Sequence, residues 1–246
     1  MGAEVEPVPV DAEGLRVEDG IASAPDALLA LVSPGQHAPL GVTMSPARRH
    51  ALLDWATTKN AWIIEDDYLG ELQLEGRAAP ALAAGKGAER VIHIGAFSKT
   101  ISPALGLGFI VAPHSVAERL VEVAAVLAPA PNRTTQLAVT EFLEDGHFLR
   151  HLRRMKALYA RRRSLALDCL NAFLPGTLTA GLGLIAPLPT TANDTAVVDI
   201  ARSRGLRAFC SLRLVPSPQS RATRPATPAR RTCASTTSMP RAKRLR

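Results

Sequence analysis

The chain has 246 residues and a formal net charge of +7, with 29 Lys and Arg against 22 Asp and Glu. Eight of the basic residues and no acidic residue lie in residues 221–246, so residues 1–220 are close to neutral and the charge does not support a nucleic-acid-binding domain. Hydrophobic residues make up 47% of the chain, which indicates a protein with a buried core and excludes a wholly disordered one.

The sequence carries no sign of export or of a membrane span. No stretch approaches the roughly 20 apolar residues that a membrane-spanning helix needs. Residues 1–6 contain two glutamates where a signal peptide would have basic residues and then an apolar run. The three cysteines are far apart, which suggests neither a disulfide scaffold nor a zinc site. We therefore expect a cytoplasmic protein without a membrane span or a metal.

The first part of the chain predicts strands and one helix. Residues 5–17 alternate apolar and polar side chains, as in a short strand and turn, and residues 28–32 form a compact apolar run that predicts a buried strand. Ser45 and Pro46 have the features of a helix N-cap and first turn, and apolar residues follow at helical spacing.

Three more apolar runs follow, at 61–64, 90–94 and 108–111, and each predicts a buried strand. Strands that alternate with helices at these intervals are typical of a parallel sheet covered by helices. Residues 115–174 predict long helices, the second of them basic and amphipathic. Residues 177–208 predict a smaller α+β unit.

Ionisable side chains follow two of the predicted strands. Residues 65–68 (EDDY) come after the strand at 61–64, and Ser98 and Lys99 follow the strand at 90–94. Each group could be a solvated turn if taken alone. Because ligands bind beyond the carboxyl ends of parallel strands, a carboxylate, a phenol and a lysine at one edge together point to a pyridoxal phosphate site. The lysine would form a Schiff base, and the carboxylate would keep the pyridine nitrogen protonated.

Several blocks of the sequence occur in a familiar order. They are VPVDAEGLRV, PGQHAPLGVTMSPARRHALLDWA, WIIEDDY, RVIHIGAFSKT, PALGLGF and EDGHFLRHLRRMKALYARRR. In these blocks the chain resembles the aminotransferase-like domain of MocR-type regulators, a branch of the GntR transcription factors. The resemblance implies an α/β fold of the fold-type I pyridoxal phosphate-dependent transferases, with a parallel-rich sheet, flanking helices and a partial small α+β domain.

The resemblance also implies a role for each site residue. Lys99 would form the Schiff base, Asp66 would contact the pyridine nitrogen, Tyr68 the ring oxygen and Ser98 the phosphate. The implied partners are an amino acid or keto acid and a second copy of the chain in a homodimer. The implied domains are a partial large domain over residues 1–145, a connecting helix with a partial small domain over 146–216, and a disordered basic tail over 217–246.

The chain departs from the family pattern at several positions. Gly106 stands where relatives usually have an arginine that binds the cofactor phosphate, and Ala96 stands where a hydroxyl residue is common. The segment around Gly35, Gln36 and His37 also differs. Because a charge-assisted hydrogen bond contributes about 1.5–3 kcal/mol, we expect weaker cofactor binding than in typical relatives.

Two parts of the family pattern are not found. We expect no DNA-binding domain in this chain, since the winged helix of the relatives is missing together with the first part of the cofactor domain. Arg207 and Arg213 lie near the expected substrate-carboxylate arginine, but neither falls in a matching motif. The basic tail could be an arm for nucleic acid, although it lacks aromatic residues for stacking; an unstructured extension is the favoured interpretation.

Three functions fit these observations. The chain could transfer an amino group through Lys99 and the cofactor, or it could be the amine-sensing module of a regulator that uses the same chemistry. Alternatively, it could be a truncated, inactive remnant with weak or no cofactor binding, which Gly106 and Ala96 favour over active catalysis.

Overall fold

The computed structural model describes residues 4–76, 78–127, 131–206 and 208, all within one compact unit, Met1–Val215. The predicted disordered tail at 217–246, Arg207 and Arg213 lie outside the described residues. The boundary predicted after residue 145, between a partial large domain and a connecting helix with a partial small domain, stays a prediction. No helix within the described ranges is both long enough and apolar enough to span a bilayer.

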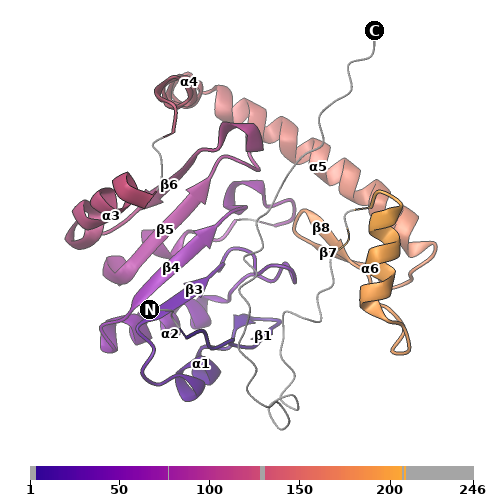
Figure 1. The fold of residues 1–246 in the computed structure, drawn as a ribbon, viewed down its shortest axis with the longest axis horizontal. Helices are drawn as coiled ribbons and strands as arrows, with labels where there is room; N and C mark the ends of the chain where they lie inside the picture. Colours follow the sequence, from indigo (N-terminus) through magenta and orange to yellow (C-terminus); the bar gives the residue numbers. More distant parts are fainter. Residues whose placement is uncertain (1–3, 77, 128–130, 207, 209–246) are drawn as a thin grey trace. The chain divides into compact units, whose positions relative to one another are not determined.

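A four-stranded sheet forms the centre of the unit, in the order β3-β4-β5-β6 (Figure 1). Its strands are β3 (Leu29–Val32), β4 (Trp62–Asp67), β5 (Val91–Ala96) and β6 (Gly108–Val111). The first three are parallel, which confirms the α/β class with a parallel-rich sheet. The fourth strand is antiparallel to β5, because the short connection at 97–107 is a turn and a 3₁₀ helix rather than a helical crossover.

Strand β4 is longer than predicted. The sequence predicts a strand that ends at residue 64, but β4 continues through Asp67, and the three acidic residues therefore belong to the sheet. Residues 65–67 stay in the sheet because all three pair with β5, where Asp66 lies opposite Ile94, and Glu65 also pairs with Val32 of β3. Successive side chains consequently point to opposite faces of the sheet.

Helix α2 (Pro46–Thr58) covers one face of the sheet. Its N-cap is Ser45, whose side chain accepts a hydrogen bond from the Arg48 backbone at 3.4 Å, as the Ser-Pro pair predicts. The buried side of the helix packs against apolar side chains from all three parallel strands. This main core contains Val32, Leu52, Leu53, Trp55, Ala56, Ile63 and Val91.

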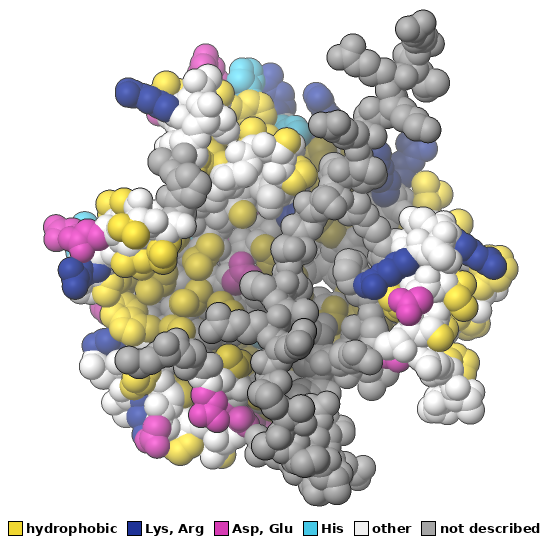
Figure 2. Space-filling model, viewed as in Figure 1, with side chains coloured by type: hydrophobic (Ala, Val, Ile, Leu, Met, Phe, Trp, Pro, Cys, Tyr) yellow, Lys and Arg dark blue, Asp and Glu magenta, His cyan; other side chains and the backbone are white. Residues whose placement is uncertain are grey.

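The opposite face of the sheet is largely open within the described residues. Leu29 and Leu31 of β3 are 52% and 70% exposed, and Ile110 of β6 is 52% exposed. Figure 2 shows hydrophobic side chains gathered over this region, beside helix α3 (His114–Leu127). Asp66 belongs to this face, because it alternates with Glu65, which is buried on the α2 side.

A second apolar cluster lies under the segments that follow β4 and β5. It joins Leu69 and Leu72 to Phe148 and Leu152 of helix α5 (His147–Asn171). The helices predicted within 115–174 are confirmed as α3, α4 (Arg133–Glu144) and α5. Residues 177–208 contain a hairpin and one helix, and their separation as a small α+β unit stays a prediction. The remaining elements are β1 (Val10–Asp11), β2 (Gly14–Leu15), α1 (Val17–Ser23), η1 (Gly70–Leu72), η2 (Leu82–Ala84), η3 (Ala88–Arg90), η4 (Pro103–Leu105), β7 (Leu178–Ala180), β8 (Gly183–Ile185) and α6 (Asp194–Ser203).

Candidate functional site

Asp66 lies near the end of β4, on the open face of the sheet, as a half-buried carboxylate. No hydrogen bond reaches this carboxylate within the described part of the chain. Burial raises the pKa of Asp66, and the neighbouring charge of Asp67 raises it further. An acid in this setting gains from a positively charged N–H partner, because such a partner replaces the lost hydration.

Tyr68 follows β4 directly and is held at both ends. Its ring packs in the second apolar cluster, and its hydroxyl donates to the Gln36 carbonyl at 3.3 Å. Burial raises the pKa of Tyr68, and the charge of Asp66 adds to this effect. The phenol is therefore neutral at physiological pH and remains a hydrogen-bond donor.

Ser98 and Lys99 lie in the turn that follows β5. The backbone of Ile101 donates to the Phe97 carbonyl at 2.8 Å and closes the turn, while Lys99 is exposed and Ser98 is half-buried. The register of the two strands places Asp67 opposite Gly95. The turn therefore follows β5 at the same sheet edge at which Tyr68 follows β4.

The structure thus brings the four predicted residues to one edge of the sheet, as the strand pattern predicts. They do not contact one another directly in any hydrogen bond or ion pair within the described residues. Ile101 and Tyr68 pack in the same apolar cluster, which connects the two segments beneath the edge. The edge therefore offers an acid, a phenol, a hydroxyl and an amine, none of which is paired with another.

The sequence did not predict two residues of α5 whose side chains contact backbone carbonyls of the turn that follows β5. His151 of α5 lies 2.9 Å from the Thr100 carbonyl through Nε2, and the Tyr159 hydroxyl donates to the Lys99 carbonyl at 3.4 Å. The only signal in the sequence is that Tyr159 continues the apolar stripe of the predicted amphipathic helix. Nothing in the local pattern says which loop that stripe meets.

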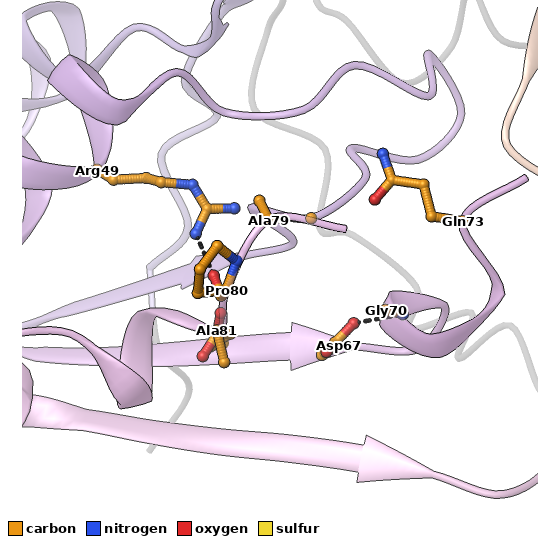
Figure 3. A pocket seen from close by; sticks show the side chains of 9 residues that line it. Arg49, Asp67, Gly70, Gln73, Ala79, Pro80 and Ala81 are labelled. Carbon is orange, nitrogen blue, oxygen red and sulfur yellow. Dashed lines mark hydrogen bonds between the residues drawn. The ribbon is translucent and has the colours of Figure 1, made fainter. Parts of the chain in front are cut away.

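A small cavity, lined by charged and apolar residues, lies on the other face of the sheet, next to α2 (Figure 3). Arg49 reaches into this region and donates to the carbonyls of Met44, Pro34 and Pro80 at 3.0, 2.9 and 2.7 Å. Asp67 accepts from the Gly70 backbone at 2.7 Å. None of the four predicted site residues lines this cavity. Asp66 points to the opposite face of the sheet. The lining of the cavity is Gly35, Arg49, Glu65, Asp67, Gly70, Gln73, Ala79, Pro80 and Ala81.

The positions that depart from the family pattern have distinct surroundings. Gly106 has a left-handed backbone with φ of +57°, and a Cβ there would meet no atom within 4 Å. Ala96 is the last residue of β5 and pairs with Gly108. His37 is buried with Nε2 unpaired, and burial, then the charge of Arg49, lower the pKa of its imidazole. At position 106, an arginine side chain would have space, but the left-handed backbone would be strained.

The α/β fold with its mainly parallel sheet is also found in solved aminotransferases. The kynurenine aminotransferase of Pyrococcus horikoshii, solved with PMP, superimposes with a TM-score of 0.72 at 25% identity, over 81% of this chain and 52% of that one. An archaeal alanine:glyoxylate aminotransferase gives a TM-score of 0.74 at 27% identity, over 83% and 54%.

Residues 1–196 match the family described as aminotransferase class I and II, and the chain belongs to that family. Its sequence relatives include regulators. It is 34% identical to the probable rhizopine catabolism regulatory protein MocR of Rhizobium meliloti, over 83% of this chain and 42% of the relative. It is 35% identical to the pyridoxine biosynthesis regulator PdxR of Corynebacterium glutamicum, over 84% and 45%. The chain thus spans less than half the length of these relatives, and the predicted resemblance to MocR-type regulators is confirmed.

Proposed function

We propose that this chain is a pyridoxal phosphate-binding, aminotransferase-like module that senses or transforms an amine through Lys99. The observation that carries the proposal is the Asp66 carboxylate. It is half-buried and lacks a hydrogen-bond partner within the described residues, and it lies at the sheet edge from which the Lys99 turn continues. A protonated pyridine nitrogen is the kind of partner that such a carboxylate lacks.

The four residues fit the cofactor in complementary roles. When bound, pyridoxal phosphate supplies an electron-withdrawing ring that stabilises negative charge on the α-carbon of an amine. Lys99 would hold the cofactor through its side-chain amine, which is the kind of nucleophile that reacts with an aldehyde. Asp66 would hold a proton on the ring nitrogen, Tyr68 would donate to the ring oxygen, and Ser98 would donate to the phosphate.

The relatives favour amine sensing as the use of this site. Those named above are described as regulators of rhizopine catabolism and of pyridoxine biosynthesis. The solved neighbours that catalyse amino-group transfer support the same chemistry for the site. We therefore propose an amino acid or related amine as the ligand, a cytoplasmic location, and a homodimer as the working assembly.

A spectroscopic titration tests the proposal. Wild-type protein mixed with pyridoxal phosphate should develop a visible absorption band that Lys99→Ala abolishes, whereas Lys86→Ala, which removes another exposed lysine, should retain it. Borohydride reduction followed by peptide mass spectrometry should place the cofactor on Lys99. The absence of a band at saturating cofactor would refute the proposal and favour the inactive remnant.

Amino acids added to the loaded protein then separate the two uses of the site. Formation of keto acid in proportion to amino acid consumed would identify amino-group transfer. A spectral change without keto acid would identify sensing.

A further inference from the structure

We infer that His151 and Tyr159 of helix α5 are positioning residues, which fix the turn that carries Lys99 in the orientation that cofactor binding requires. The inference rests on the proposed role of Lys99. It concerns a different part of the molecule, however, because the two residues lie 51 and 60 positions beyond the carbonyls that they contact.

The two side chains bind neighbouring carbonyls of one turn. His151 Nε2 lies 2.9 Å from the Thr100 oxygen, and since a carbonyl can only accept, the ring donates. The Tyr159 hydroxyl donates to the Lys99 oxygen at 3.4 Å, which is the longer and weaker of the two bonds. This pair of contacts, the α5 bracket, therefore acts on the backbone of Lys99 and leaves its exposed amine available.

The turn cannot satisfy these two carbonyls by itself. Its internal hydrogen bonds run from Ile101 and Ser102 to the oxygen of Phe97, at 2.8 and 3.2 Å. No backbone N–H within the described residues donates to the oxygens of Lys99 and Thr100. Side chains from α5 consequently supply contacts that the local sequence does not provide.

Helix α5 also contacts the segment that follows Tyr68. Phe148 and Leu152 pack with Leu69 and Leu72, which follow Tyr68 closely. Met155 and Tyr159 continue the same stripe at helical spacing, and His151 flanks it. One rigid helix therefore touches both the segment after β4 and the turn after β5, which fixes the separation of Tyr68 from Lys99.

The second half of the helix makes anchoring contacts as well. Arg163 donates to the Gly181 carbonyl in the β7–β8 hairpin at 2.8 Å and forms an ion pair with Glu75. The Arg163 side chain is only 11% exposed, so this pair is largely shielded from solvent on the arginine side. These contacts connect α5 to the β7–β8 hairpin and to Glu75.

The test compares two histidines of the same helix. His151 and His147 both pack on the ring of Phe142, with centroids 5.8 and 6.0 Å away, but His147 makes no hydrogen bond to the turn within the described residues. In cofactor-free protein, we expect His151→Ala to speed hydrogen exchange of the Ile101 and Ser102 amides about fivefold. His147→Ala should leave both amides unchanged.

The same variants are then titrated with pyridoxal phosphate. His151→Ala should weaken binding about fivefold, His151→Gln should restore part of the affinity through its amide donor, and Tyr159→Phe should cause a smaller loss with the ring packing intact. If exchange or affinity in His151→Ala equals that of His147→Ala, the inference is overturned. If wild-type protein forms no band while the exchange difference persists, the proposed function fails and the α5 bracket remains as a purely structural feature.

Discussion

Glu65 and His93 face each other across β4 and β5, and Glu65 Oε2 lies 2.9 Å from His93 Nδ1. The glutamate is only 2% exposed, and its two oxygens also accept from the backbones of Leu82 and Ala83 at 2.7 and 3.1 Å. A single buried carboxylate thus ties the sheet to η2. This acid is structural, whereas Asp66, the next residue, faces the open side of the sheet.

Replacement of Glu65 by Gln should destabilise the fold. The amide NH₂ would face a backbone donor, which leaves one buried N–H without an acceptor and removes charge-assisted bonds. We expect a loss of about 2–3 kcal/mol in the free energy of unfolding, measured by urea denaturation. Glu71→Gln, which alters an exposed side chain, should change it by less than about 0.5 kcal/mol. Equal midpoints for the two variants would contradict the structural role of Glu65.

Asp66 should make the cofactor-free protein less stable as pH rises. Because burial and Asp67 raise its pKa above the ordinary value of 3.8, the folded state binds more protons than the unfolded state just above that pH. Stability is therefore lost as pH rises from about 3.8 through the folded pKa. Asp66→Asn removes this loss, so its stability relative to wild type should increase across that window and then level off.

Urea unfolding of Asp66→Asn and wild type, from a pH about one unit below the ordinary carboxyl pKa up to neutrality, measures this difference. Asp54→Asn on the exposed side of α2 is the control. The same Asp66→Asn protein should bind pyridoxal phosphate more weakly than wild type. A stability difference that shrinks with rising pH would show that the carboxylate has a partner in the fold.

Gly106→Arg should bind pyridoxal phosphate more tightly and fold less stably. The guanidinium adds a charge-assisted contact of about 1.5–3 kcal/mol, which corresponds to at least about tenfold in affinity. The left-handed backbone costs about 1 kcal/mol for any residue with a Cβ. Gly106→Ala is the matched control, since it should show the stability loss without the gain in affinity. Unchanged affinity in Gly106→Arg would contradict the assignment of this position to the phosphate.

Gly181→Ala should disturb the contact between the β7–β8 hairpin and the loop beside Tyr68. Gly181 has φ of +60°, and a Cβ would lie 2.0 Å from the Gln36 side-chain amide. Gly205→Ala has the same kind of backbone, with φ of +83°, and an open surrounding. We expect Gly181→Ala to lose about 1 kcal/mol more than Gly205→Ala in thermal or urea unfolding, since Gln36 must move. Equal losses of unfolding free energy in the two variants would show that the Gln36 side chain moves away from the new Cβ without a cost in stability.

Local patterns were sufficient for most of the secondary structure. The Ser45-Pro46 start of α2 is an effect of neighbouring residues, since a hydroxyl caps a backbone N–H three positions ahead. The predicted end of β4 was wrong, because the true end depends on residues that are distant in the sequence. Charged residues favour a loop locally, but the backbone of Asp66 is paired with Ile94 of β5, which lies far away in the sequence.

The candidate site, like the secondary structure, was predicted only in part by local sequence patterns. The sequence by itself determined that Asp66, Tyr68, Ser98 and Lys99 follow apolar strands, and parallel strands must bring their carboxyl ends to one edge. Only the tertiary structure decided which acid is buried with His93, which acid faces the open side, and that α5 holds the Lys99 turn. Hydrophobic periodicity encodes which side of each element is buried, whereas the partner of a buried polar group depends on strand register and on contacts between distant segments.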